Sequence, residues 1–106
     1  MSVEQKVLRK VTSVLDLKKL KKSLPREPHV VLIIPEEYVN FEGEDALKVT
    51  IVLSNDTTDE QLAGDNVFRL NSVIRHAVQD AGIALFPYTF FATEAELEEL
   101  ELEDEE

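Results

Sequence analysis

Four acidic residues stand close together in the middle of the chain, where their carboxylates could hold a divalent cation. They are Asp56, Asp59, Glu60 and Asp65, and Ca²⁺ in particular binds several carboxylate oxygens at once. Their spacing lacks the Asp-x-Asp-x-Asp-Gly pattern of a calcium loop. Carboxylates are also favoured at the start of a helix, because they interact well with its dipole. We therefore interpret the cluster as a helix start and predict no metal site.

Nucleophilic and acid–base catalysis have little support in the residue types. The chain has no cysteine and no serine in a Gly-x-Ser-x-Gly turn, and its three glycines form no phosphate-binding loop. His29 has no neighbouring His or Cys that would make a ligand set. His76 shares a helical face with Arg69, Ser72 and Gln79, which we interpret as a solvated face. We predict that the protein is not an enzyme and has no catalytic residues and no cofactor.

Positive charge is concentrated in the first quarter of this acidic chain. Residues 1–26 carry eight basic and two acidic groups (+6), and residues 27–106 carry three basic and twenty acidic groups (−17), which together give the net charge of −11. The overall acidity argues against broad nucleic-acid binding, because phosphate contacts need clustered Lys and Arg. The basic run could nevertheless meet RNA, an anionic membrane or an acidic partner. This candidate basic patch consists of Lys18, Lys19, Lys21, Lys22 and Arg26.

No segment is apolar enough to suggest export or a membrane span. The N-terminus has no uninterrupted apolar run of the kind found in a signal peptide. The longest apolar run covers residues 30–34, far short of the roughly 20 residues that a membrane helix needs. The absence of cysteine fits a reducing compartment. We expect a cytoplasmic protein without a membrane span.

The hydrophobic spacing predicts a helix over residues 2–24, with a break near residues 12–13 where Ser13 or Asp16 could cap a second piece. Pro25 and Pro28 end this helix. Residues 29–34 predict a strand, and their apolar side chains on both faces indicate an interior strand that is covered above and below. Residues 35–46 are acidic and contain Pro and Gly; we interpret them as a hairpin connection that could extend the strands at either end.

Residues 47–91 form the centre of the predicted fold, as a strand, a helix and a second strand. Residues 47–53 alternate apolar and mostly polar side chains, the period of a half-buried strand. A capping box, either Thr57 with Glu60 or Thr58 with Gln61, opens the helical region, and Asp65 could cap the main helix. Gly82 is a natural helix stop. Pro87 in the strand at residues 83–91 marks an edge position or a bulge.

The predicted fold class is α+β, a single small domain over residues 1–100 with the order α-β-β-α-β-α. The first two strands pair antiparallel through a hairpin, whereas a helical connection between the second and third favours parallel pairing. The result is a three-stranded mixed sheet with helices packed on it. Thr93 and Glu96 form a further capping box that opens a last short helix. Residues 101–106 are almost entirely acidic, and we predict a disordered tail.

Two substantial helices need not cover all the apolar side chains on the two faces of a three-stranded sheet. Phe90 and Phe91 are consecutive, so in a strand they point to opposite faces. An uncovered apolar area of several hundred Å² marks an interaction site. We therefore predict a docking surface for a protein partner or for a second copy of the chain, in a homodimer. This candidate partner surface consists of Val52, Tyr88, Phe90 and Phe91.

Three segments show a weak likeness to a known family. Residues 30–34 stand where that family has its first strand, residues 44–49 where it has an Asp-x-Asp strand, and residues 91–97 are similar to its Thr-x-Glu-Glu segment. On this pattern residues 20–100 resemble a minimal nucleotidyltransferase domain. Pro35-Glu36 replaces the family's Gly-Ser turn, Ala46 stands for its second metal-binding Asp, and residues 83–86 offer no third carboxylate. The resemblance therefore implies the fold with the active-site motifs missing.

Taken together, these patterns favour a small acidic, non-enzymatic protein-interaction domain. A degenerate or divergent nucleotidyltransferase-like protein is the first alternative, and it requires Glu44, Asp45, Asp56 and Asp59 to converge on one cleft. An RNA-binding accessory protein is the second, and it requires the candidate basic patch to lie on one exposed face.

Overall fold

Two short helices form the N-terminal segment of the computed structural model, which describes residues 5–104. Helix α1 is Gln5–Val14 and helix α2 is Leu17–Leu20. Asp16 starts the second helix, because its carboxylate accepts a hydrogen bond of 2.9 Å from the Lys18 amide. The predicted break in the N-terminal helix is confirmed. It lies between Val14 and Leu17, a few residues later than expected, and Asp16 is the cap. Residues 2–4 of the predicted helix lie outside the described residues.

Strands β1 and β2 form a long antiparallel hairpin. β1 is Val30–Val39 and β2 is Asp45–Leu53, so the strands take up much of the segment that the sequence predicts as a connection. The side-chain oxygen of Asn40 closes the turn by accepting hydrogen bonds from the amides of Glu42 (3.0 Å) and Glu44 (2.9 Å). Asn suits such turns because its short side chain reaches the backbone two residues on.

Helix α3 connects the hairpin to the last strand. It is Asp65–Asp80, and strand β3 is Pro87–Thr93. The residue before α3 is Gly64, which has no side-chain cap, so the prediction that Asp65 caps the helix is wrong by one position. The predicted stop is confirmed: Gly82 has a φ of +73°. The Ile83 amide bonds to the Val78 carbonyl (3.2 Å) and the Gly82 amide to the Gln79 carbonyl (2.9 Å), the pair of bonds that closes a Schellman motif.

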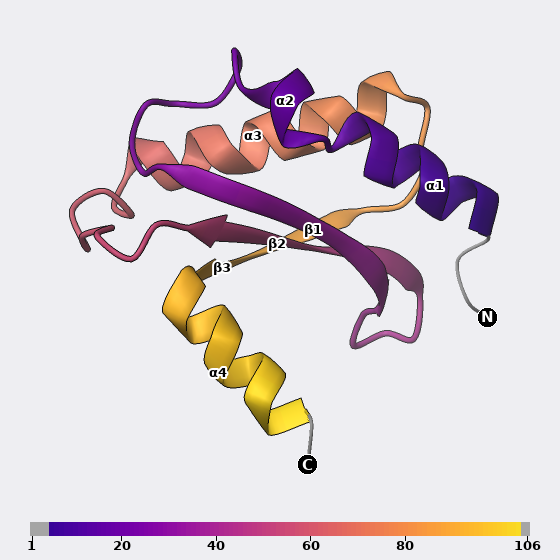
Figure 1. Ribbon diagram of the computed structural model, residues 1–106. Coiled ribbons are helices and arrows are strands. Elements are labelled where there is room, and N and C mark those ends of the chain that lie inside the picture. Colours follow the sequence, from indigo (N-terminus) through magenta and orange to yellow (C-terminus); the bar gives the residue numbers. More distant parts are fainter. Residues whose placement is uncertain (1–4, 105–106) are drawn as a thin grey trace.

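The sheet has the strand order β1-β2-β3, with β1 antiparallel and β3 parallel to β2. Figure 1 shows α1, α2 and α3 on one side of the sheet and α4 on the other. This architecture confirms the predicted α+β class and the mixed three-stranded sheet. β1 is nevertheless an edge strand and Leu32 is 46% exposed, so the prediction of an interior strand covered on both faces is wrong. Pro87, by contrast, begins an edge strand, as predicted.

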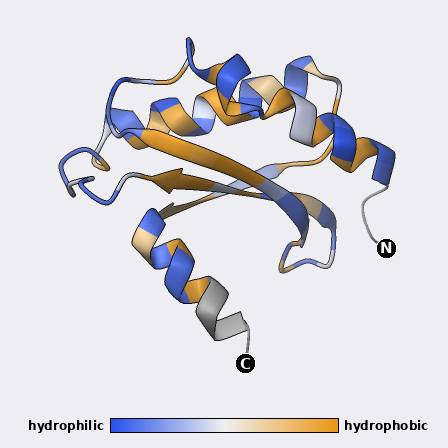
Figure 2. Ribbon diagram, viewed as in Figure 1, coloured by the Kyte–Doolittle hydropathy of each residue, from blue (hydrophilic) through white to orange (hydrophobic). Residues whose placement is uncertain are grey.

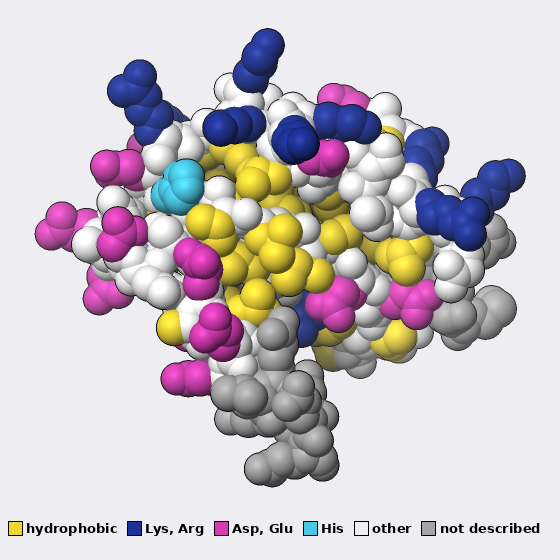
Figure 3. Space-filling view, viewed as in Figure 1, with side chains coloured by type: hydrophobic (Ala, Val, Ile, Leu, Met, Phe, Trp, Pro, Cys, Tyr) yellow, Lys and Arg dark blue, Asp and Glu magenta, His cyan; other side chains and the backbone are white. Residues whose placement is uncertain are grey.

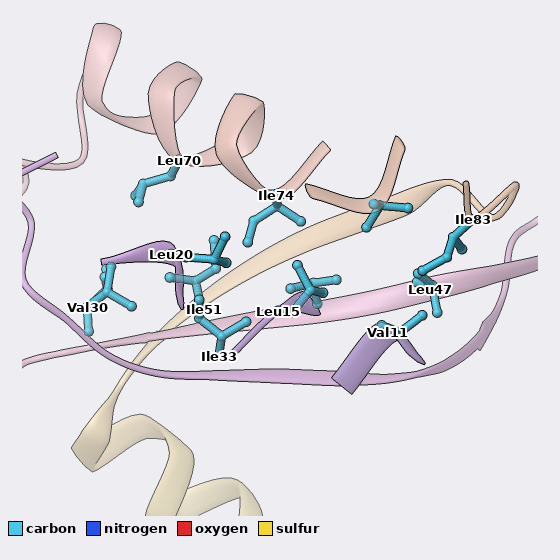
Figure 4. Close-up of a cluster of buried hydrophobic side chains, with 13 residues drawn as sticks. Val11, Leu15, Leu20, Val30, Ile33, Leu47, Ile51, Leu70, Ile74 and Ile83 are labelled. Atoms are coloured by element: carbon cyan, nitrogen blue, oxygen red, sulfur yellow. The ribbon is translucent and has the colours of Figure 1, made fainter. Parts of the chain in front are cut away.

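The hydrophobic core lies between the sheet and the three helices above it. Figure 4 shows side chains from α1 and α2, from α3 and from the upper face of β1 and β2 pointing toward one another. The alternation predicted for β2 is confirmed, because Leu47, Val49, Ile51 and Leu53 are at most 1% exposed. In Figure 2 the hydrophobic residues of β1 lie under the helices, whereas the end near the hairpin turn is hydrophilic. The amphipathic stripes therefore determine which side of the sheet the helices cover.

Helix α4 is Glu94–Asp104 and packs against β3 and β2. The predicted capping box is present: the Thr93 amide donates to Glu96 (3.0 Å), and the Glu96 amide donates to the Thr93 hydroxyl (3.3 Å). A bond from the Ala95 amide to Asn55 (2.9 Å) ties the helix start to the loop after β2. α4 continues to Asp104 and so extends into the acidic segment 101–106 for which the sequence predicts a disordered tail. Residues 105–106 lie outside the described residues.

Candidate functional site

The sheet face opposite α1–α3, which we call the open face, carries an ordered array of side chains. The core residues Ile33, Val49 and Ile51 face the helices, so their neighbours along each strand face away. The strand register places these neighbours in three rows across the sheet. The rows are Leu32–Val52–Ala92, Ile34–Thr50–Phe90 and Glu36–Lys48–Tyr88.

One end of the open face holds an aromatic cluster of Tyr38, Phe86, Tyr88 and Phe90. The ring centroid of Tyr38 lies 5.5 Å from that of Tyr88 and 5.9 Å from that of Phe90. The ring centroids of Phe86 and Tyr88 lie 4.9 Å apart. Ala46, the partner of Tyr38 on β2, is too small to separate the rings and is itself 1% exposed. The tilted and edge-to-face contacts are the geometries that aromatic pairs prefer. The cluster is therefore a packed aromatic surface rather than a row of independent rings.

Two cationic side chains lie over this cluster. The Lys48 Nζ is 5.4 Å from the centroid of Phe90, and the Arg75 guanidinium is 5.7 Å from that of Phe86. Both distances are within the range of cation–π attraction. A pocket of about 350 Å³ lies beside the Arg75 contact, between α3 and β3. It is lined by Asn71, Arg75, Phe86, Pro87, Tyr88, Thr89 and Phe90.

Parts of the open face are freely accessible. Leu32 is 46% exposed and Phe90 40%, and Phe86 at the border of the face is 50% exposed. Large apolar side chains at these fractions lose much of the favourable free energy that burial would contribute. Grouped on one face, they form the kind of surface that marks an interaction site. The arrangement offers apolar and aromatic contact, together with a single amine from Lys48.

The candidate partner surface predicted from the sequence is only partly on this face. Tyr88 and Phe90 lie on it, as expected. Val52 points to the same side but is 1% exposed, and Phe91 packs against the core, so these two residues are not part of the exposed surface. Tyr38 and Leu32 were not included in the prediction from the sequence. Tyr38 lies beyond residue 34, where the strand was predicted to end, and Leu32 was expected to be covered because that strand was predicted to be an interior one.

The candidate basic patch is divided by the structure. All five side chains are exposed, but only Lys18, Lys21 and Arg26 line a common pocket, beside His29. Lys19 and Lys22 do not line it, and the Lys19 Nζ donates to the Ser13 hydroxyl (3.1 Å). The RNA-binding alternative requires the whole patch on one face, whereas a single pocket unites three of its five members.

The carboxylates of the enzymatic alternative do not meet. Glu44 and Asp45 lie at the hairpin end of β2, whereas Asp56 and Asp59 follow its other end. A nine-residue strand is about 30 Å long, so the four carboxylates do not line one cleft. Among the side chains that the structure describes, those of residues 5–100, no group of three or more His, Cys, Asp or Glu is placed to hold a metal ion. His76 is an exposed residue of α3, on the polar face predicted for it.

Among the described residues, no helix has the length and apolar character needed to cross a membrane. Comparison of the chain with protein-family models, with curated proteins and with solved structures finds no match in any of the three. The fold and the surface together define a small α+β protein with a three-stranded mixed sheet. Helices cover one face of that sheet, and the other presents an aromatic cluster to solvent.

Proposed function

We propose that this chain is a non-enzymatic protein-interaction domain that binds its partner through the open face. The observation that supports this proposal is the aromatic cluster, whose members Phe86 and Phe90 are exposed, together with the exposed Leu32 on the same side of the sheet. Aromatic side chains dominate the binding energy of protein interfaces, because they bury a large area at a low cost in conformational entropy. Lys48 adds one cation that a partner's acceptor group can meet.

The charge around the open face favours a heterologous partner over a face-to-face homodimer. Glu36 lies on the face next to Lys48, and Glu37 and Glu44 lie near the hairpin end. In a face-to-face pair of a chain with a net charge of −11, the acidic borders of the two copies would approach each other, and like charges brought together at an interface oppose binding. The partner therefore has an apolar centre with basic groups around it.

The dimensions of the face indicate a modest contact. β3 has seven residues, so the three-stranded face is about 23 Å long and about 15 Å wide, or roughly 350 Å² in projection. A stable protein–protein interface buries about 800 Å² per partner. The sheet face alone therefore suits a helix or an extended segment of a partner, or a transient complex.

The test is a comparison of Phe90→Ala with a matched variant, Phe68→Ala. Phe68 is a 72% exposed phenylalanine on α3, on the other side of the sheet. Partners are enriched from an extract of the native cells with the wild-type chain, then purified and measured by calorimetry. We expect a purified partner that Phe68→Ala binds as well as the wild type and that Phe90→Ala binds at least about tenfold more weakly.

The proposal fails if every purified partner binds Phe90→Ala as tightly as the wild type. It also fails if light scattering shows a dimer that Phe90→Ala disrupts, because the face would then bind a second copy instead.

A further inference from the structure

A second concave site lies on the other side of the molecule, between α2 and the start of β1. It is a pocket of about 460 Å³, within the size range of ligand sites. It opens beside the free edge of β1, away from the aromatic cluster. Its lining consists of Leu17, Lys18, Lys21, Leu24, Pro25, Arg26, His29, Val30 and Val31.

The pocket combines an apolar floor with a basic border. Val31 reaches it because the β1–β2 register shifts between Val30 and Leu32, which leaves Val31 outside the regular pairing. The charged groups Lys18, Lys21 and Arg26 are exposed around this floor. In Figure 3 a hydrophobic surface runs over β1, with Lys and Arg side chains above it and acidic side chains below it.

The C-terminal helix of the same chain has the acidic and apolar side chains that would complement this pocket. α4 carries four described glutamates, and two of them, Glu96 and Glu99, are exposed on the side of the helix where Leu100 lies, which is 53% exposed. Figure 1 shows α4 on the opposite side of the sheet from α2. The helix of one chain therefore cannot reach the pocket of that chain, but the helix of a second copy can.

We propose that the pocket binds α4 of a second copy, in a head-to-tail contact. Leu100 enters the apolar floor, and Glu96 and Glu99 meet Lys18, Lys21 and Arg26. The same segregation of charge that opposes face-to-face pairing favours this arrangement, because it brings the basic end of one copy to the acidic end of the next. This contact does not involve the open face and does not depend on the proposed function.

The head-to-tail geometry makes a specific prediction about the assembly. Each copy keeps a free pocket at one end and a free helix at the other, so the contact does not close on itself unless the rotation forms a ring. The mean mass is therefore expected to rise continuously with concentration rather than to stop at a dimer. Salt is expected to weaken the contact, because exposed charges are screened over about 10 Å at 0.1 M ionic strength and about 3 Å at 1 M.

The experiment uses the full chain and charge reversals on each side of the contact. The pocket variant is Lys18→Glu with Lys21→Glu, and the helix variant is Glu99→Lys, because Glu96 also forms the capping box of α4. Sedimentation equilibrium measures association up to about 1 mM, a range in which weak contacts are detectable. We expect each variant alone to associate at least about tenfold more weakly than the wild type. Mixing the two variants is expected to restore association, because native pockets meet native helices and reversed pockets meet reversed helices.

Matched controls separate this contact from general electrostatics. Lys19→Glu with Lys22→Glu changes the same charge in the same segment but outside the pocket lining. Glu98→Lys changes the same charge as the helix variant at the neighbouring exposed position of α4, which points to nearly the opposite side of the helix from Leu100. Both controls are expected to associate within about twofold of the wild type and more tightly than the pocket and helix variants. A wild type that stays monomeric, a mixture that does not recover, or a control that weakens association as much as its matched variant would each overturn the proposal.

Discussion

Replacement of Val52 by threonine tests whether α4 covers the open face at the end of the sheet where this helix begins. Val52 is 1% exposed, whereas Leu32, its cross-strand neighbour on the same face, is 46% exposed. The difference arises because Val52 is on the central strand and near the start of α4, which contacts both β2 and β3. We therefore expect the burial of Val52 to depend on α4, whose start is tied to the loop after β2 by the bond from the Ala95 amide to Asn55.

The expected cost follows from the change of one methyl group to a hydroxyl. Valine and threonine have nearly the same shape and both suit strands, so Val52→Thr changes little else. A hydroxyl that is buried without a hydrogen bond costs about 1–3 kcal/mol in protein mutants. For a domain of this size, a loss of about 1 kcal/mol lowers the melting temperature by about 4–8 °C. We expect Val52→Thr to lower it by at least about 4 °C.

Urea denaturation with a matched variant measures this cost. Val39→Thr makes the same change on β1 at a side chain that is 58% exposed, and its free energy of unfolding should stay within about 0.5 kcal/mol of the wild type. If Val52→Thr and Val39→Thr lowered the free energy of unfolding equally, the burial of Val52 would be refuted. A second comparison uses a chain that ends at Thr93. In that chain Val52→Thr should lower the free energy of unfolding by less than it does in the full chain. An unchanged loss would show that α4 does not cover Val52.

Two further substitutions test local features of the chain. Gly82→Ala should lower the free energy of unfolding by about 1–2 kcal/mol, because φ is +73° while a Cβ there would meet no atom within 4 Å; urea denaturation that shows no loss would contradict the left-handed helix end. Thr93→Ala should cost about 1 kcal/mol and reduce the helical signal in far-ultraviolet circular dichroism, because it removes the cap of α4. Glu98→Ala, at an exposed position within α4, is the control, and equal effects of these two variants would count against the cap.

Features that depend on neighbouring residues were predictable from the sequence. Gly82 ends α3 because glycine adopts a left-handed backbone without strain. Asp16 starts α2 because its carboxylate reaches an amide two residues on. The alternation along β2 placed Leu47 and Ile51 in the core, because successive side chains of a strand point to opposite faces.

The position of β1 in the sheet could not be predicted in the same way. Its apolar run has side chains for both faces, a pattern typical of an interior strand. In the structure β1 is at the edge, and the surplus side chains line two different surfaces: Leu32 is on the open face, and Val31 lines the pocket beside α2. The same pattern is therefore compatible with an edge strand whose surplus apolar side chains line exposed surfaces.

The sequence by itself determined the elements, their order and the faces on which their apolar side chains lie. These properties depend on backbone geometry and on bonds between residues a few positions apart. Only the tertiary structure decided which of those faces is covered, because cover comes from elements that are distant in the chain. Val52 is buried on the central strand, which α4 contacts, and Phe91 packs against the core beneath α1–α3, whereas Phe90 is 40% exposed on the opposite side. That division of the consecutive phenylalanines between core and surface separates the residues that stabilise this fold from those available to a partner.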